Sequence, residues 1–286
     1  MSNKKHEIYL KRKFDTYLAE WKSRDDRLPL IIKGARQVGK TECVRHFAEG
    51  RYKSVVEINF VERPEFKAIV RDGYSVASVI RNISSVEPAF RFVDNETLVF
   101  FDEIQEFPEI ATSFKFFAQD GRFDVIASGS LLGVHYRRIE SISVGFQESV
   151  EMRSLDFEEF LWARGYSKDQ IASLVEPLLR RVPFSDAVKN SLDRLFMDYC
   201  ALGGMPAVVE NYFLKGTFEG VCAFSRGSSG TIVRIFENTA RDLILCGFLP
   251  CSTRYLRNLR RKTRSSSGRP LNMVPRQRTT GVASSG

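Results

Sequence analysis

The chain has 286 residues, of which 43% are hydrophobic and 27% are charged, a composition that supports a folded core in one or two domains. No apolar run approaches the ~20 residues of a membrane span, and the polar N-terminus lacks the pattern of a secretion signal. The five cysteines have no metal-binding or redox spacing and the three histidines are scattered, which argues against a Cys- or His-based metal site and against His-based catalysis. We therefore expect a cytoplasmic protein with reduced thiols and no membrane partner.

The net charge of +8 is unevenly distributed along the chain. Residues 222–286 carry 12 Lys and Arg but only 2 Asp and Glu, whereas residues 1–221 carry 31 against 33. Because the first part is close to neutral, its charge gives no reason to expect nucleic-acid binding there. The basic tail keeps nucleic-acid binding open, although a charge run such as 257–264 is more often solvated or disordered.

The first predicted element is a helix near the N-terminus. Four aromatic or apolar residues recur there at helical spacing, namely Phe14, Tyr17, Leu18 and Trp21. Such a stripe is typical of a helix that packs on a core rather than of a ligand site.

The most specific single motif is GARQVGKT at residues 34–41, which matches the phosphate-binding pattern G-x-x-x-x-G-K-[ST] at every position. The apolar residues 28–32 precede it and predict a buried strand, and Val44 and Phe47 follow it at helical spacing. A strand, a glycine-rich loop and a helix in this order are the context in which the pattern binds phosphate. The sequence therefore predicts a nucleotide-binding loop here.

Each part of this loop has a predicted role. Gly34 and Gly39 let the backbone curl so that successive N–H groups point at phosphate oxygens, and the following helix adds the positive end of its dipole. Lys40 is predicted to act in catalysis by placing its charge on the outer phosphates, and the Thr41 hydroxyl is predicted to bind Mg²⁺. The predicted ATP-binding residues are Gly34, Ala35, Arg36, Gln37, Val38, Gly39, Lys40 and Thr41.

A second motif, TLVFFDE at residues 97–103, has four apolar residues followed by two carboxylates. The apolar run predicts a central parallel strand that is buried on both faces. Asp102 then stands at the carboxyl end of the strand, where ligands bind in open α/β sheets, and we predict that it holds Mg²⁺ directly or through water. Glu103 is the predicted general base that polarises the attacking water.

A third apolar run, FDVIASGS at residues 123–130, predicts another strand that ends in small polar residues. P-loop ATPases of the additional-strand type have a polar sensor residue at this place, beside the acidic strand. Ser128 is the first candidate for this catalytic sensor and Ser130 is the second. A plain strand-to-helix turn is the alternative.

A helical region is predicted after residue 154. Asp156 begins the segment DFEEFLWARG, which has an acidic first turn and Gly165 as its stop signal. Further helices are expected at 168–180 and 185–200, and the turn LGGMP at 202–206 should lead into another helix.

With these motifs the chain resembles the prokaryotic AAA-type ATPases that join an N-terminal ATP-binding domain to a C-terminal domain of unknown function. The resemblance extends from the N-terminus to about residue 220 and implies ATP binding and hydrolysis. It defines no cellular role, and a protein partner or an oligomer stays open. GARQVGKT, DEIQ and LDFEEFLWA together are more specific than the glycine loop alone. The matching segments are YLKRKFDTYLAEWK (9–22), PLIIKGARQVGKT (29–41), VFFDEIQ (99–105), ASGSLLG (127–133), VGFQESVEMRSLDFEEFLWA (144–163) and LGGMPAVVENY (202–212).

Many ATPases of this type complete the site with an arginine from a second subunit. Arg137 and Arg138 are candidates because they follow the sensor strand. Related proteins often have Gly-Arg just before the strand that leads into the LDFEEF-like segment. Here the pair is Gly145-Phe146, so the usual assignment does not carry over directly.

The predicted fold is α/β: a P-loop NTPase three-layer sandwich with a parallel sheet, followed by a helical region and a disordered basic tail. The predicted domains are an AAA-type ATPase domain at 1–153, a helical linking region at 154–221 and the tail at 222–286. The predicted function is Mg²⁺-dependent ATP binding and hydrolysis. A nucleotide-dependent switch or partner-binding module with little turnover and a nucleic-acid-associated ATPase are the alternatives. A small-molecule kinase is disfavoured because the glutamate of the Asp102-Glu103 pair serves to activate water.

The tail is expected to be an out-of-frame translation of the family's C-terminal domain. The resemblance stops near residue 222, Arg and Ser become frequent, and acidic residues nearly vanish. The segments IFENT (235–239) and RKTRSS (261–266) can both be encoded by bases that, at the same one-base offset, read as segments similar to the family's C-terminal half. A genuine basic tail is the alternative.

Overall fold

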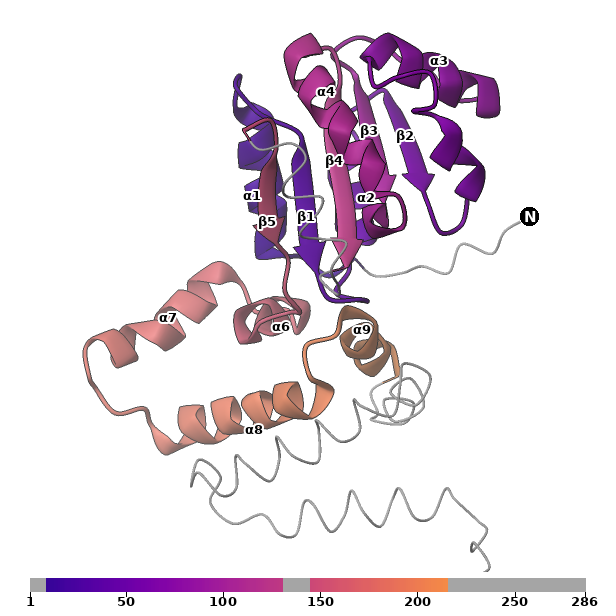
Figure 1. The fold of residues 1–286 in the computed structure, drawn as a ribbon. Coiled ribbons are helices and arrows are strands. Elements are labelled where there is room, and N and C mark those ends of the chain that lie inside the picture. The colour runs from indigo at the N-terminus through magenta and orange to yellow at the C-terminus, as the bar shows by residue number, and fades with distance from the viewer. Residues whose placement is uncertain (1–8, 131–144, 216–286) are drawn as a thin grey trace, which may run out of the picture. The chain divides into compact units, whose positions relative to one another are not determined.

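The computed structural model describes residues 9–130 and 145–215 of the chain. Its centre is a sheet of five parallel strands in the order β2-β3-β4-β1-β5 (Figure 1). The strands are β1 (Leu30–Gly34), β2 (Ser54–Asn59), β3 (Thr97–Asp102), β4 (Asp124–Ser130) and β5 (Glu148–Glu151). Because β4 lies between β1 and β3, the strand before the glycine loop, the strand that carries Ser128 and the strand that ends in Asp102 all end at the same edge of the sheet.

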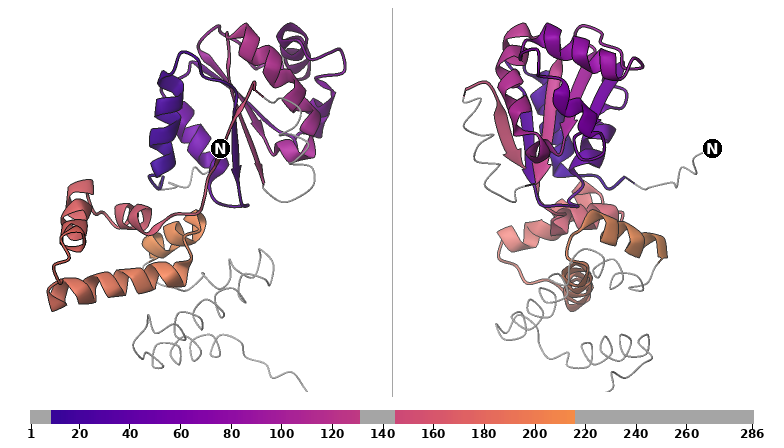
Figure 2. Two further views of the ribbon diagram at one scale, coloured as in Figure 1. Left: turned by 60° about the vertical axis from the view of Figure 1, so that its left-hand side comes forward. Right: turned by 45° about the vertical axis from the view of Figure 1, so that its right-hand side comes forward.

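Helices cover both faces of this sheet. Alternate residues of the strands point to opposite faces. One face packs against α1 (Lys13–Ser23) and α2 (Lys40–Ala48), and the other packs against α3 (Val76–Val86) and α4 (Phe114–Asp120) (Figure 2). The predicted α/β three-layer sandwich with a parallel sheet is therefore confirmed.

Besides α3 and α4, the connections between β2 and β4 contain three short helical turns. They are η1 (Pro64–Ala68), η2 (Ile104–Glu106) and η3 (Pro108–Ser113), all of the 3₁₀ type. Every residue of β3 is buried, as the continuous apolar run predicts for a central strand.

The N-terminal helix α1 packs as its sequence predicts. Leu18 and Trp21 are buried in the core, and Phe14 and Tyr17 pack against its edge. Trp21 Nε1 donates a hydrogen bond to Leu28 O at 3.0 Å, which ties the end of α1 to the segment before β1. The aromatic stripe is thus part of the core.

A second group of helices follows β5 and has a hydrophobic core of its own. Its members are α6 (Phe157–Ala163), α7 (Lys168–Leu179), α8 (Asp186–Leu202) and α9 (Pro206–Lys215). At the start of α6, Glu159 N donates to the Asp156 carboxylate at 2.9 Å, and Asp156 N donates to the Glu159 carboxylate at 3.0 Å. Gly165, with φ +95°, follows the helix. The helices predicted after residue 154 are therefore present.

The turn between α8 and α9 is held against the segment that leaves β5. Leu155 N donates to Gly204 O at 2.8 Å, and Tyr199 Oη donates to Leu155 O at 2.9 Å. α9 begins two residues later with Pro206, which comes close to the glycine loop. The helical region is thereby fixed beside the carboxyl edge of the sheet.

The predictions for the tail at 222–286, including its out-of-frame origin, concern residues outside the described ranges. The same is true of Arg137 and Arg138. Within the described ranges, no helix combines the length and the apolar character that crossing a membrane requires.

Candidate functional site

The polar residues of the three motifs meet at the carboxyl ends of β1, β3 and β4. The loop 34–41 connects β1 to α2, Asp102 ends β3, and Ser128 lies near the end of β4. In the register of the sheet, Ser128 pairs with Ile32 of β1, and its neighbour Ala127 pairs with Phe101 of β3. Segments that are far apart in the sequence thus contribute to one site.

The loop 34–41 has the curled backbone that anion binding requires. Gly39 has φ +89° and Gln37 has φ +64°, both in the left-handed region, so the chain turns sharply between β1 and α2. α2 begins at Lys40, which brings the positive end of the helix dipole to the loop. The tip of the loop, residues 35–37, is exposed. This backbone can receive phosphate oxygens on its N–H groups.

Lys40 folds back into the loop that carries it. The residue is 7% exposed, and its Nζ donates to Gly34 O at 3.0 Å and to Ala35 O at 2.9 Å. Burial lowers the pKa of Lys40, while the negative charges of Glu103 and Asp102 act to raise it. Phosphate oxygens in the loop would replace the two carbonyl acceptors and stabilise the ammonium form further.

Asp102 is the centre of a hydrogen-bond network. Its Oδ2 accepts from Thr41 Oγ1 at 3.0 Å and from Asn59 Nδ2 at 3.1 Å. Its Oδ1 accepts from Ser128 Oγ and from Glu103 N, the latter at 3.1 Å. Asp102 is 3% exposed, so four donors fix the orientation of a buried carboxylate.

The oxygen atoms at this point suit a small divalent cation. Thr41 offers a hydroxyl and Asp102 a carboxylate, and Mg²⁺ prefers such ligands, with only one or two of them from the protein beside phosphate and water. In the described part of the chain, no group of three or more His, Cys, Asp or Glu residues could hold a metal ion. The donor set therefore fits a Mg²⁺ ion that is bound together with phosphate groups.

The two sensor candidates and Asn59 take different places around this network. Ser128 is fully buried and contacts Asp102 through its hydroxyl. Ser130 takes part through its backbone N, which donates to Gln105 Oε1 at 3.1 Å. Asn59 belongs to no motif, but the β2–β3 register pairs it with Asp102. A polar residue at the end of the strand beside the acidic strand is the signal that could have identified it.

Glu103 leaves β3 in an unusual conformation. Its φ of +56° and ψ of +46° lie in the left-handed region, which is uncommon for a residue with a side chain and is enriched at functional sites. Its carboxylate accepts a hydrogen bond from Gln105 Nε2. The predicted base is thus adjacent to the predicted metal ligand Asp102 and near Lys40, whose pKa its charge affects.

Comparison with known families identifies this arrangement. Residues 26–161 match a family model described as an AAA domain. This part of the chain is an AAA-type P-loop NTPase domain. It is accordingly a nucleotide-binding domain, built on the sheet with the strand order β2-β3-β4-β1-β5. A comparison with curated protein sequences finds no match.

Two of the solved structures similar to the chain are distant in sequence. The Orc1 protein of Aeropyrum pernix, solved in complex with DNA, is 14% identical with a TM-score of 0.36, and the match covers 58% of this chain and 50% of that one. PCH-2 of C. elegans is 12% identical with a TM-score of 0.33, and the match covers 61% of this chain and 49% of that one. The matched part is thus about half the length of either protein.

Arg12 ties the glycine loop of the AAA domain to the segment after β5. Its Nη1 donates to Val38 O at 2.9 Å, and its Nη2 donates to Arg153 O at 2.6 Å. Its Nε lies 3.3 Å from Glu159 Oε1 of α6, and both residues are 5% exposed. Arg12 lies in the matching segment 9–22, but the sequence does not indicate its role, because its three partners come from other segments of the chain.

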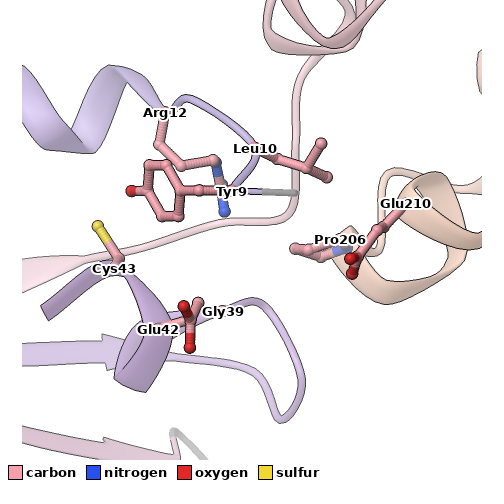
Figure 3. A pocket seen from close by; sticks show the side chains of 8 residues that line it. All are labelled: Tyr9, Leu10, Arg12, Gly39, Glu42, Cys43, Pro206 and Glu210. Carbon is pink, nitrogen blue, oxygen red and sulfur yellow. The ribbon is translucent and has the colours of Figure 1, made fainter. Parts of the chain in front are cut away.

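A pocket opens beside the loop of the AAA domain, where α2 begins (Figure 3). It is lined by Tyr9 from the segment before α1, by Gly39 and Cys43 on the α2 side, and by Pro206 and Glu210 of α9. A Cβ on Gly39 would lie 3.5 Å from Pro206 Cγ, so α9 packs directly on the loop. Burial raises the pKa of Cys43 to about 12, which keeps its thiol protonated.

Proposed function

We propose that the protein binds Mg²⁺-ATP at residues 34–41 and hydrolyses it. The observation that carries this proposal is the contact of 3.0 Å between Thr41 Oγ1 and Asp102 Oδ2, next to the buried Lys40. It supports a shared Mg²⁺ position between the two motifs, on the side of the outer phosphates.

The residues have separate tasks in this reaction. Backbone N–H groups of 34–41 bind the phosphates, and Lys40 stabilises the charge that develops on the terminal phosphate. Thr41 and Asp102 would hold Mg²⁺, which supplies further positive charge to the phosphates. Glu103 accepts a proton from the water that attacks the terminal phosphorus. Ser128 keeps the Asp102 carboxylate oriented through its hydrogen bond.

The pocket beside the loop is the proposed place for the nucleoside. It borders Gly39 at the end of the loop, and the ring of Tyr9, already stacked on His46 at a centroid distance of 3.7 Å, provides aromatic surface for a base. Pro206 and Glu210 bring α9 to the same pocket. In this proposal the chain divides into an ATPase domain at 1–153 and a helical region at 154–221 that covers the nucleotide.

The contacts of Arg12 favour a second candidate function, a nucleotide-dependent switch. Val38 of the loop and Glu159 of α6 share Arg12 as a partner, so a loop that closes on phosphate acts directly on the helical region. In this alternative, ATP binding rearranges the helices and hydrolysis is slow. The near-neutral charge of residues 1–221 gives no comparable support to a nucleic-acid-associated ATPase.

Steady-state phosphate release, measured beside ATP binding, tests the proposal. The Glu103→Gln variant should still bind ATP, but it should hydrolyse ATP roughly 10²–10⁴-fold more slowly than the wild type, the usual effect of losing a general base. Asp102→Asn should instead weaken Mg²⁺-dependent binding. Glu106→Gln, the same change at an exposed residue in η2, is the matched control and should turn over like the wild type.

Two outcomes would count against hydrolysis by this route. Equal turnover in Glu103→Gln and the wild type would remove Glu103 as the base. Tight ATP binding by the wild type without phosphate release would favour the switch.

A further inference from the structure

Gln105 contacts two different parts of the candidate site. Its Nε2 donates to the Glu103 carboxylate, and its Oε1 accepts from Ser130 N at 3.1 Å. Ser130 is the last residue of β4, the strand that also carries Ser128. One carboxamide therefore bridges the base candidate and the end of the sensor strand.

The two contacts together fix the orientation of this carboxamide. The reverse orientation would turn Oε1 toward the Glu103 carboxylate and the NH₂ group toward Ser130 N–H, and neither hydrogen bond could form. As long as Oε1 of Gln105 accepts the hydrogen bond from Ser130 N, the NH₂ group of Gln105 points toward the Glu103 carboxylate as a donor.

The position of the carboxamide depends on the absence of a side chain at Gly129. A Cβ on Gly129 would lie 3.0 Å from Gln105 Oε1 and 3.2 Å from Ile104 Cγ1, closer than ordinary van der Waals contact. The backbone of Gly129 is not in the left-handed region, so alanine is sterically allowed there by the backbone. Alanine at this position would push the Gln105 amide oxygen and Ile104 away by a few tenths of an ångström, without altering Gln105 itself.

Glu103 acts on the cation of the glycine loop while Gln105 holds its carboxylate. Its left-handed backbone turns it out of β3, and its negative charge acts to raise the pKa of Lys40, the cation of the loop. A glutamate side chain has several freely rotating bonds, so without a partner it would occupy many orientations. The hydrogen bond from Gln105 selects one of them.

We infer that Gln105 is a positioning residue, which holds the Glu103 carboxylate in the orientation that accepts a proton from the attacking water and fixes it relative to the end of β4. This inference rests on the proposed function, because it requires Glu103 to be the base. Gln105 itself touches neither ATP nor the water in this role.

Two substitutions at Gln105 test the role in different ways. Gln105→Ala removes both contacts, whereas Gln105→Glu keeps the shape and the acceptor for Ser130 N but turns a second carboxylate toward Glu103. In both we expect kcat to fall about 10–100-fold, the cost of a misplaced catalytic group, with little change in KM or in ATP affinity. Thermal unfolding measured in parallel shows whether the variants fold as the wild type does.

Two further variants distinguish the positioning role of Gln105 from a nonspecific effect of substitution. Gly129→Ala should lower kcat as Gln105→Ala does, because it displaces the same amide. Gln119→Glu makes the same chemical change as Gln105→Glu at an exposed residue of α4, and it should behave like the wild type.

A double-mutant cycle ties the effect to Glu103. In the Glu103→Gln background, Gln105→Ala should cause no further loss of kcat, because the group it positions has lost its function. Losses that multiply would mean that Gln105 acts independently of Glu103, which overturns the inference.

The remaining outcomes separate this inference from the proposed function. If Glu103→Gln is slow but both Gln105 variants turn over like the wild type, the inference fails and the proposed function stands. Faster turnover in Gln105→Ala also overturns it, because Gln105 would then restrain Glu103. If Glu103→Gln turns over like the wild type, Glu103 is not the base and the inference fails, although hydrolysis itself stands.

Discussion

The glycine loop carries two cations with different surroundings. Lys40 is buried and hydrogen-bonded to loop carbonyls, whereas Arg36 is exposed and forms no hydrogen bond or ion pair with any residue that the structure describes. We predict that Lys40→Ala abolishes or severely weakens Mg²⁺-ATP binding, because it removes the charged donor from inside the loop. Arg36→Ala removes the same formal charge from the tip and should weaken binding less. Calorimetric titration with Mg²⁺-ATP compares the two, and wild-type affinity in Lys40→Ala would contradict the assignment of the loop.

At the level of single residues, the sequence predicts what lies within a motif and misses what depends on register. Lys40, Thr41 and Asp102 were found because their spacing within each motif is itself the signal. Gln105 lies within the DEIQ segment, but its contact, like that of Asn59, is made by a side chain that reaches a neighbouring strand, and only the strand order reveals that neighbour. Such contacts need the three-dimensional arrangement, because one sequence carries no record of which strands pair.

Among the elements, the link between the loop and α6 depends on one buried ion pair. Arg12→Ala would leave Val38 O and Arg153 O without their donor and Glu159 without its cation. We predict a loss of about 3 kcal/mol in the free energy of unfolding, the cost of removing one partner from a buried pair. Urea unfolding followed by circular dichroism measures it.

The neighbouring residue Lys13 provides the control for this experiment. Its Nζ lies 2.6 Å from Asp156 and 2.7 Å from Glu158, but its side chain is 48% exposed. Because exposed pairs stabilise little, Lys13→Ala should cost less than about 1 kcal/mol. If both variants lost the same free energy of unfolding, burial of the Arg12–Glu159 pair would not add to its contribution to stability.

Elements were predictable where local signals mark their ends. α6 lies between the cap at Asp156 and the stop at Gly165, and both signals are readable in the sequence. β2 has no such signal, because as an edge strand it buries only Val56 and Ile58 among its six residues. Its existence is decided by pairing with β3, which is a tertiary effect.

At the scale of the whole molecule, the helical region keeps an apolar surface. Large side chains near the end of α7 are exposed, with Leu178 at 60%, Leu179 at 79% and Val182 at 54%. Large apolar side chains that are exposed together usually mark a surface that contacts another protein or another part of the same protein. Within the described residues, the end of α7 therefore carries an exposed apolar surface.

The loop, the Asp102 network, Gln105 and the pocket all lie within the described residues 9–130 and 145–215. We therefore predict that removal of residues 223–286 leaves Mg²⁺-ATP affinity unchanged, because no group assigned to the nucleotide is lost. Titration of the shortened and full-length proteins with Mg²⁺-ATP tests this, and loss of binding would show that the tail contributes to the site or to its folding.

Sequencing of the gene tests the origin of the tail independently. A one-base correction near codon 222 that opens a frame through a C-terminal domain similar to the family's would support an out-of-frame tail, whereas a frame that closes at once in both other registers would establish the tail as native.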